Sequence, residues 1–168
     1  MGRSGHIADI RARFGSGLLL MPSVGNAVLD GERLLLVRHV HDGRWGTPGG
    51  AIEPGESPAE AAERELHEET GLRLSPSSVI AVTGGPEHVV RYPNGDETAY
   101  VTTLFAVPWD GSEVRPDHDE VDTATWIAAD ERHAYDMDPL TRDHVEIVFA
   151  WLNQPPTARA AFFRPATG

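Results

Sequence analysis

The stretch Gly50–Leu72, GAIEPGESPAEAAERELHEETGL, carries the clearest structural signals in the chain. Ser57 is a typical N-cap residue, Pro58 suits the first helical position, and Glu60 stands three residues after the cap, as a capping box requires. Gly71 favours a helix stop, because glycine readily adopts the left-handed conformation that closes a last turn. The pattern predicts a helix that begins at Pro58 and ends just before Gly71.

Three glutamates of this predicted helix share one face. Glu65, Glu68 and Glu69 are spaced i, i+3 and i+4, which places them within an arc of about 100°. The adjoining stripe is apolar and would pack on a sheet: Ala59, Ala62 and Leu66. The carboxylates would then lie at the edge of the core, where a hard divalent cation would relieve their repulsion. All-oxygen ligands favour Mg²⁺ or Mn²⁺ over Zn²⁺. The alternative is a solvated acidic helix face.

The remaining residues of the stretch favour the metal site. The segment resembles the Nudix box, Gly-x5-Glu-x7-Arg-Glu-U-x-Glu-Glu-x-Gly-U, in which U is aliphatic. Every fixed position is matched, by Gly50, Glu56, Arg64, Glu65, Leu66, Glu68, Glu69, Gly71 and Leu72. Seven exact matches at this spacing arise by chance roughly once in 10⁸ starting positions. The chain therefore resembles the Nudix hydrolases, which cut a diphosphate linkage in a nucleoside diphosphate joined to another group.

The resemblance implies a metal site and a mechanism. Glu65, Glu68 and Glu69 resemble the metal-binding acids, and the backbone carbonyl of Gly49 would complete the site. The metal, Mg²⁺ or Mn²⁺, would bridge phosphate oxygens, neutralise developing charge and acidify the water that attacks phosphorus. No protein nucleophile is needed for this chemistry.

Three further residues resemble parts of the family's catalytic machinery. Arg64 and Glu56 resemble the internal pair that holds the loop against the helix, whereas a plain surface ion pair would contribute little. Glu120, in an acidic loop, resembles the additional carboxylate that assists from the second half of such proteins. The alternative for Glu120 is a solvated loop charge.

Four residues outside the box are candidates for substrate binding. Arg38 and Arg44 precede the box and could contact phosphate, or could be surface charges. Arg91 and Tyr92 could line a nucleoside pocket, with Tyr92 stacking on a base, although packing at a strand edge is the commoner role for such residues. No histidine is assigned to the metal.

The box does not specify the group attached to the nucleoside diphosphate. Pro86 resembles the proline marker of ADP-ribose-cleaving members but arrives slightly early, and Tyr92 resembles the tyrosine of dinucleoside polyphosphate hydrolases but arrives slightly late. We expect an ADP-ribose-like nucleotide sugar, with a nucleoside triphosphate as the second choice. The alternative function is a non-catalytic module that senses a nucleotide, although such modules usually lose box acids, all of which are kept here.

Outward from the box, strand and helix signals alternate. Strands are predicted over 24–29, 34–38, 79–83, 87–92, 97–107 and 123–127, and helices over 6–14 and from Pro139 to about Leu152, with Asp138 as N-cap. This order predicts an α/β protein with the Nudix fold, a mixed β-sheet sandwiched between α-helices. The expected divisions are an N-terminal arm or short helix (1–20), the Nudix domain (21–153) and a C-terminal tail (154–168).

Composition narrows the possible functions. The 168 residues carry a formal charge of −12, which opposes general binding to nucleic acid. All 14 basic residues are arginines and there is no cysteine, so thiolate zinc sites, disulfides and lysine-dependent chemistry are excluded. No apolar run approaches the length of a membrane span. We expect a cytoplasmic protein that binds a small nucleotide and no membrane, with a homodimer left open.

Overall fold

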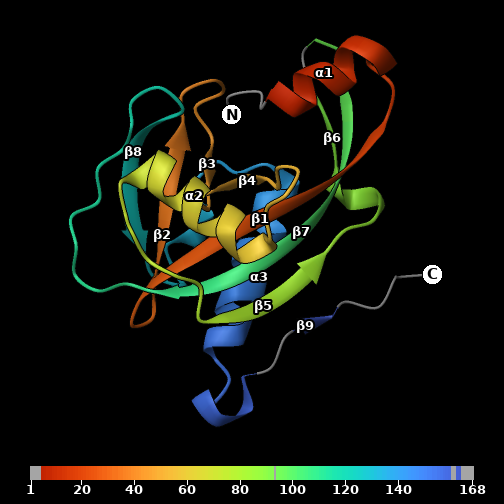
Figure 1. Ribbon diagram of the computed structural model, residues 1–168. Helices are drawn as coiled ribbons and strands as arrows, with labels where there is room; N and C mark the ends of the chain where they lie inside the picture. Colours follow the sequence, from red (N-terminus) through yellow and green to blue (C-terminus); the bar gives the residue numbers. More distant parts are fainter. Residues whose placement is uncertain (1–4, 93, 160–161, 164–168) are drawn as a thin grey trace.

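A mixed β-sheet forms the centre of the protein, which a computed structural model describes over residues 5–92, 94–159 and 162–163 (Figure 1). Its strands are β1 (Leu19–Asp30), β2 (Arg33–His39), β3 (Trp45–Gly46), β4 (Gly49–Ala51), β5 (Ser78–Thr83), β6 (Val89–Arg91), β7 (Glu97–Pro108), β8 (Val121–Ile127) and β9 (Phe162–Phe163). The helices are α1 (Gly5–Phe14), α2 (Pro58–Thr70) and α3 (Pro139–Leu152), with 3₁₀ turns η1 (Pro86–His88), η2 (Arg132–Ala134) and η3 (Pro156–Ala158).

The sheet is covered by a helix on each face. Its main path runs β3-β2-β1-β7-β5-β9, with β4 beside β1, β6 beside β7 and β8 beside β2. The long β1 and β7 pair in parallel, as do β5 and β9, whereas β2 and β4 join β1 antiparallel and β5 and β6 join β7 antiparallel. Because side chains alternate along a strand, Leu35 and Phe105 pack under α2, while Leu36 and Leu104 pack in the core beneath α3. The predicted α/β sandwich is confirmed (Figure 1).

Helix α2 has the bounds and caps predicted from the sequence. The hydroxyl of Ser57 accepts a hydrogen bond from the Glu60 amide, the Ser57 amide donates to the Glu60 carboxylate at 2.8 Å, and Gly71 closes the helix with φ 71°. The buried apolar residues of the helix are Ala61, Ala62 and Leu66. Ala59, predicted to belong to this stripe, is exposed. It lies in the first turn, and the buried stripe begins only at Ala61, so this turn extends past the sheet.

The other predicted elements are present with small differences. The segment between β2 and α2, for which no strand is predicted, contains β3 and β4, whose backbone pairs with β2 and β1 although their side chains carry no strand pattern. The strand predicted over 87–92 is shorter, because Pro86 starts the 3₁₀ turn η1 before β6 begins. In the turn after β6 the amide of Gly95 donates to the carbonyl of Tyr92, and Pro93 lies outside the described residues.

The N-terminal helix α1 is held against the sheet by hydrogen bonds from one arginine. Arg11 is buried, and its guanidinium donates to the carbonyl of Gly17 at 2.6 Å, to the carbonyl of Glu97 at 2.7 Å and to the hydroxyl of Thr98 at 2.9 Å. These bonds hold α1 against the start of β7. The domain boundaries at 20–21 and 153–154 stay predictions. Among the described residues, no helix is long and apolar enough to cross a membrane.

Candidate active site

The acidic face of α2 lies against two glycines of β4. A Cβ on Gly49 would clash with the carbonyl oxygen of Val24, and a Cβ on Gly50 would clash with the carboxylate of Glu65. Gly49 therefore requires glycine, because the backbone of the neighbouring strand lies too close for a Cβ, whereas at Gly50 the close neighbour is the flexible end of the Glu65 side chain. The box glycine thus brings an acid of α2 against the backbone of β4.

Glu69 is the most buried of the three box acids on this face. The residue is 3% exposed, and its carboxylate accepts a hydrogen bond from the Gly49 amide at 3.0 Å. Burial raises the pKa of the Glu69 carboxyl well above its usual range, and the charge of Glu65 raises it further. Burial also raises the pKa of Glu65, an effect that the Arg64 guanidinium opposes. Both carboxylates are therefore held where negative charge is poorly solvated.

Glu68 and Glu120 extend this cluster toward solvent. The Glu68 side chain is 58% exposed and contacts Arg64. The charge of Glu120 raises the pKa of both Glu65 and Glu69, which places it within electrostatic reach of the box acids. Backbone bonds fix its position at the start of β8, where its amide donates to Asp117 at 3.1 Å and its carbonyl accepts from the amide of Val40. The tertiary fold thus brings Glu120 to the acids with which it was predicted to act.

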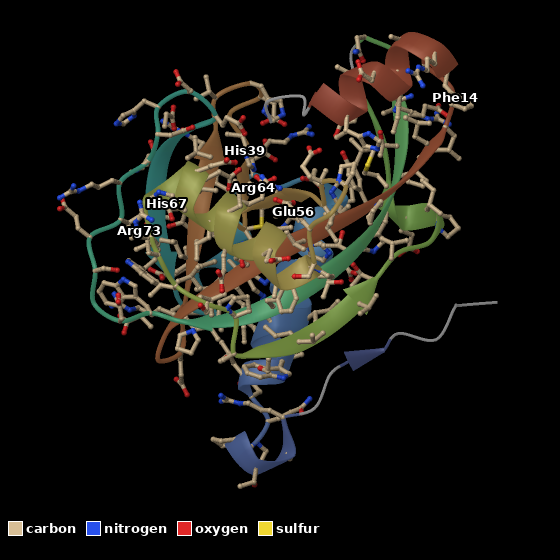
Figure 2. All side chains as sticks on the ribbon, in the orientation of Figure 1. Phe14, His39, Glu56, Arg64, His67 and Arg73 are labelled. Atoms are coloured by element: carbon tan, nitrogen blue, oxygen red, sulfur yellow. The ribbon has the colours of Figure 1, made fainter. Side chains whose placement is uncertain are left out.

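Arg64 is the cation that binds these carboxylates. Its Nε and Nη2 donate to the two carboxylate oxygens of Glu56 at 2.6 and 3.0 Å, and Nη2 also donates to the carbonyl of Ala51 at 3.1 Å. The remaining Nη1 lies 2.8 Å from a Glu65 oxygen and 3.1 Å from a Glu68 oxygen. Figure 2 shows Arg64 and Glu56 close together above α2. The predicted pairing of Arg64 with Glu56 is present and ties the box loop to the helix.

The donor set fits a divalent cation. Glu65, Glu68, Glu69 and Glu120 gather four carboxylates, and Arg64 already shares its charge with Glu56. Among the described residues, no three acidic or histidine side chains converge in the geometry that holds a metal ion. Nη1 of Arg64 contacts the carboxylates of Glu65 and Glu68. A bound cation would have to replace Arg64 as the partner of these two carboxylates. Incomplete solvation, excess negative charge and all-oxygen donors match Mg²⁺ or Mn²⁺. The role predicted for the Gly49 carbonyl stays a prediction.

The two arginines before the box have carboxylate partners. Arg38 donates to both oxygens of Asp122 at 2.9 and 3.0 Å, and its guanidinium lies 5.8 Å from the ring centre of Trp45. Arg44 is exposed and lies 3.9 Å from a carboxylate oxygen of Asp136. Their part in phosphate binding stays a prediction, and a substrate would have to compete with these partners.

The other two substrate candidates lie on the β6–β7 hairpin. Arg91 is exposed and pairs with Glu97 at 2.8 Å, and the hydroxyl of Tyr92 hydrogen-bonds that of Tyr100 at 2.6 Å. Figure 1 places this hairpin beside α1 and away from α2. The structure therefore gives both residues local partners and does not join them to the acids.

A second buried polar cluster has no counterpart in the sequence predictions. The hydroxyl of Thr83 lies 2.9 Å from Nε2 of His144, and Nε2 of His88 lies 3.4 Å from a carboxylate oxygen of Asp143. Burial, together with the charge of the neighbouring His88, lowers the pKa of His144 to about 4. The spacing of His144 from the buried Thr141, at i and i+3 on α3, was the available signal for its burial.

Known proteins resemble this arrangement in sequence and in fold. The NUDIX domain model matches residues 19–150, more than half of the chain. Over 65 residues the chain is 43% identical to "Putative ADP-ribose pyrophosphatase YjhB" of Bacillus subtilis (strain 168), a match that covers 39% of this chain and only 31% of YjhB. It is 31% identical over 107 residues to nucleoside triphosphatase NudI of Klebsiella pneumoniae (strain 342), covering 62% of this chain and 76% of NudI.

Solved structures agree on the fold. The crystal structure of a MutT protein from Methanosarcina mazei Go1 superimposes with a TM-score of 0.64 at 20% identity, covering 80% of this chain and 96% of that one. At this identity the likeness concerns the fold alone. The family model supplies the assignment, and it extends over strands β1 to β8, helix α2 and all but the last two residues of α3. The chain therefore belongs to the NUDIX family of hydrolases.

Proposed function

We propose that the protein hydrolyses the diphosphate linkage of a nucleoside diphosphate derivative with the help of Mg²⁺ or Mn²⁺. The observation that carries this proposal is the carboxylate cluster of Glu65, Glu68, Glu69 and Glu120, in which Arg64 contacts Glu65 and Glu68 while it also binds Glu56. Such a cluster is costly to the folded protein unless a cation binds it. Members of the family generally use divalent metal ions.

Each residue of the site would contribute one task. Glu65, Glu68 and Glu69 would hold the cation, and Arg64 with Glu56 would keep the loop of Gly49 and Gly50 against α2. When bound, the cation would neutralise charge on the phosphate oxygens and increase the acidity of water. Glu120 would accept a proton from the attacking water, because it is the member of the cluster outside the box helix.

Water is the proposed nucleophile at phosphorus. Thr70 carries the only hydroxyl in the second half of the box, and it is completely buried. Its hydroxyl donates to the carbonyl of Leu66, one turn earlier in the helix, so it is engaged in a local bond. Thr70 is therefore removed as a candidate nucleophile, because its hydroxyl is buried and already donates within the helix.

The proposed substrate is an ADP-ribose-like nucleotide sugar. The name of YjhB connects that relative with ADP-ribose, and the name of NudI connects another with nucleoside triphosphates, which makes a triphosphate the second candidate. A non-catalytic module that senses nucleotides is the competing function. All acids of the box are present here, and retention of the complete set favours catalysis.

The test is hydrolysis of a nucleotide panel in ¹⁸O-labelled water. With Mg²⁺, ADP-ribose should yield AMP and ribose 5-phosphate, with the label on a phosphate of one product, and excess chelator should stop the reaction. A labelled free sugar, a trapped phosphoenzyme or full activity in EDTA would contradict the mechanism. Tight nucleotide binding without any turnover would favour the sensing module.

A further inference from the structure

A small cavity adjoins the box loop on the side facing the N-terminal helix. It has a volume of about 280 Å³ and lies between α1, the first residues of β1 and the loop that follows β4. His6 and Ile10 line it from α1, Leu20 lines it from β1, and residues 52–54 close it from the loop. This volume is at the lower end of small-molecule sites and suits one moiety of a nucleotide.

The cavity and the candidate active site are bordered by the same stretch of backbone. Residues 52–54 directly follow β4, whose Gly50 contacts Glu65 and whose Ala51 carbonyl binds Arg64. The amide of Glu53 donates to Glu56 at 3.0 Å, so the same loop belongs to both places. Because three residues of extended chain span about 11 Å, Gly50 and Glu53 are at most about 11 Å apart. The ribose and 5′-phosphate of a nucleotide can bridge this separation.

The lining chemistry matches a nucleobase better than a phosphate or a sugar. Seven of the nine lining residues are apolar, and the other two are His6 and Glu53. No arginine lines the cavity, and Glu53 would repel a phosphate. A planar base could bury its faces against the apolar wall and donate a ring or amino hydrogen to the Glu53 carboxylate. Leu20 is 73% exposed and would gain cover from such a ligand.

The wall formed by α1 is held in place before any ligand binds. Arg11 fastens the helix to Gly17, Glu97 and Thr98 through buried hydrogen bonds. Figure 1 shows α1 beside the start of β1 and the β6–β7 hairpin. A preformed wall lowers the entropy lost when a ligand is fixed against it.

We propose that this cavity receives the nucleobase of the substrate while the diphosphate lies at the acids of α2. The proposal rests on the proposed hydrolase function for the identity of the ligand. In this proposal α1, β1 and the loop of residues 52–54 help to select the substrate by its base. The box acids, which lie at the diphosphate, cannot make that selection.

The test compares Leu20→Glu with Leu18→Glu in the full chain. Both leucines are largely exposed, at 73% and 57%, so neither substitution should unfold the protein, and only Leu20 lines the cavity. AMP is titrated into each variant and followed by NMR shifts, and KM and kcat for ADP-ribose are measured with Mg²⁺. Leu20→Glu should weaken AMP binding at least about 10-fold, because a second carboxylate would face the base without a partner. KM should rise by a similar factor and exceed any fall in kcat.

The binding readout keeps this inference separate from the hydrolase proposal. Equal AMP affinity in the two variants would overturn the cavity assignment, even in an active enzyme. AMP binding that weakens only in Leu20→Glu would support it, even if no nucleotide were hydrolysed. Light scattering adds one further outcome: if Leu20→Glu abolishes self-association and leaves AMP affinity unchanged, a second copy of the chain covers this face and the proposal is wrong.

Discussion

Two clusters of buried ionisable side chains lie on opposite faces of the same sheet, and they are built differently. On the α2 side, the carboxylates of Glu65 and Glu69 are poorly solvated and lie near each other and near the charge of Glu120. On the α3 side, His144 is bonded to Thr83, and His88 faces Asp143, so neutral or opposite groups meet. The first cluster gathers carboxylates of one charge, whereas the second pairs each histidine with a hydroxyl or a carboxylate, and Nδ1 of the buried His88 makes no hydrogen bond.

This difference separates a candidate site from a structural group. Burial alone perturbs pKa values in both clusters, so a perturbed pKa does not by itself identify function. What distinguishes the acids of α2 is their excess of one sign of charge beside Gly49, where a Cβ would clash with the carbonyl oxygen of Val24. We propose that a cation from solution binds there with little rearrangement of the fold, because Glu65, Glu68 and Glu69 project from a helix that packs on the sheet.

The largest expected effect comes from the box acids. Glu68→Gln and Glu69→Gln should each lower kcat by roughly 10²–10⁴, since loss of one such electrostatic contact costs about 3–5 kcal/mol of barrier. The fold should persist, and Glu69→Gln should slightly raise the free energy of unfolding, because a neutral amide removes repulsion with Glu65. Steady-state kinetics and urea denaturation measure the two effects.

Glu60→Gln and Glu63→Gln are the matched controls on the same helix. Neither side chain belongs to the acidic cluster, and glutamine can also serve in the capping box of Glu60 with Ser57. Both variants should keep kcat near the wild-type value. Similar losses at all four positions would point to damaged folding rather than to a metal site.

A smaller effect is expected at Glu120. Glu120→Gln should lower kcat by roughly 10²-fold, the lower end of what a positioned proton acceptor contributes, because this residue is partly exposed on a loop. Asp119→Asn, one residue earlier and exposed, is the control and should change kcat little. If the two variants behave alike, Glu120 is a solvated loop charge.

Local sequence patterns predict the part of the site that lies on α2. The caps at Ser57 and Gly71 determine where α2 begins and ends, and helical periodicity then places Glu65 and Glu69 on a common face. Glu120 could be suggested only by family resemblance, because its approach to these acids depends on the register of β8 with β2. Periodicity alone cannot determine such a tertiary contact.

Other features of the structure depend on contacts between distant residues and cannot be predicted from local sequence patterns. The cavity beside α1 depends on Arg11 reaching Glu97 across 86 residues of sequence, and no local pattern encodes that bond. Likewise, the meeting of His88 with His144 requires β5, η1 and α3 to pack together. Ala59 was misplaced because periodicity gives the face of a helix but not the point where the sheet ends.

The cluster under α3 predicts how stability depends on pH. The pKa of His144 is about 4 in the folded protein, against an ordinary value of 6.5, so the unfolded chain binds its proton first as pH falls. Stability from this residue is therefore complete above about pH 6.5 and is lost as pH falls toward 4. Between pH 7 and pH 5 the loss should be about 2 kcal/mol.

Urea denaturation of wild type and His144→Gln at both pH values isolates this contribution. The variant should be less stable at pH 7, through its altered bond to Thr83, and should lose less stability on acidification than the wild type. An identical pH dependence in the two proteins would show that His144 does not carry it. Activity at pH 7 should change little, because the cluster lies on the face opposite to the acids of α2.

The central claim is that the acids of α2 bind a divalent cation, and direct Mn²⁺ binding tests it without any assumption about substrate. Mn²⁺ is titrated into the wild type, Glu69→Gln and the control Glu63→Gln, and the signal of free Mn²⁺ is followed by electron paramagnetic resonance. The wild type and Glu63→Gln should bind with similar Kd, and Glu69→Gln should bind at least about 10-fold more weakly, because it loses a charged oxygen ligand. Equal affinity in all three proteins, or no binding by the wild type, would contradict the account.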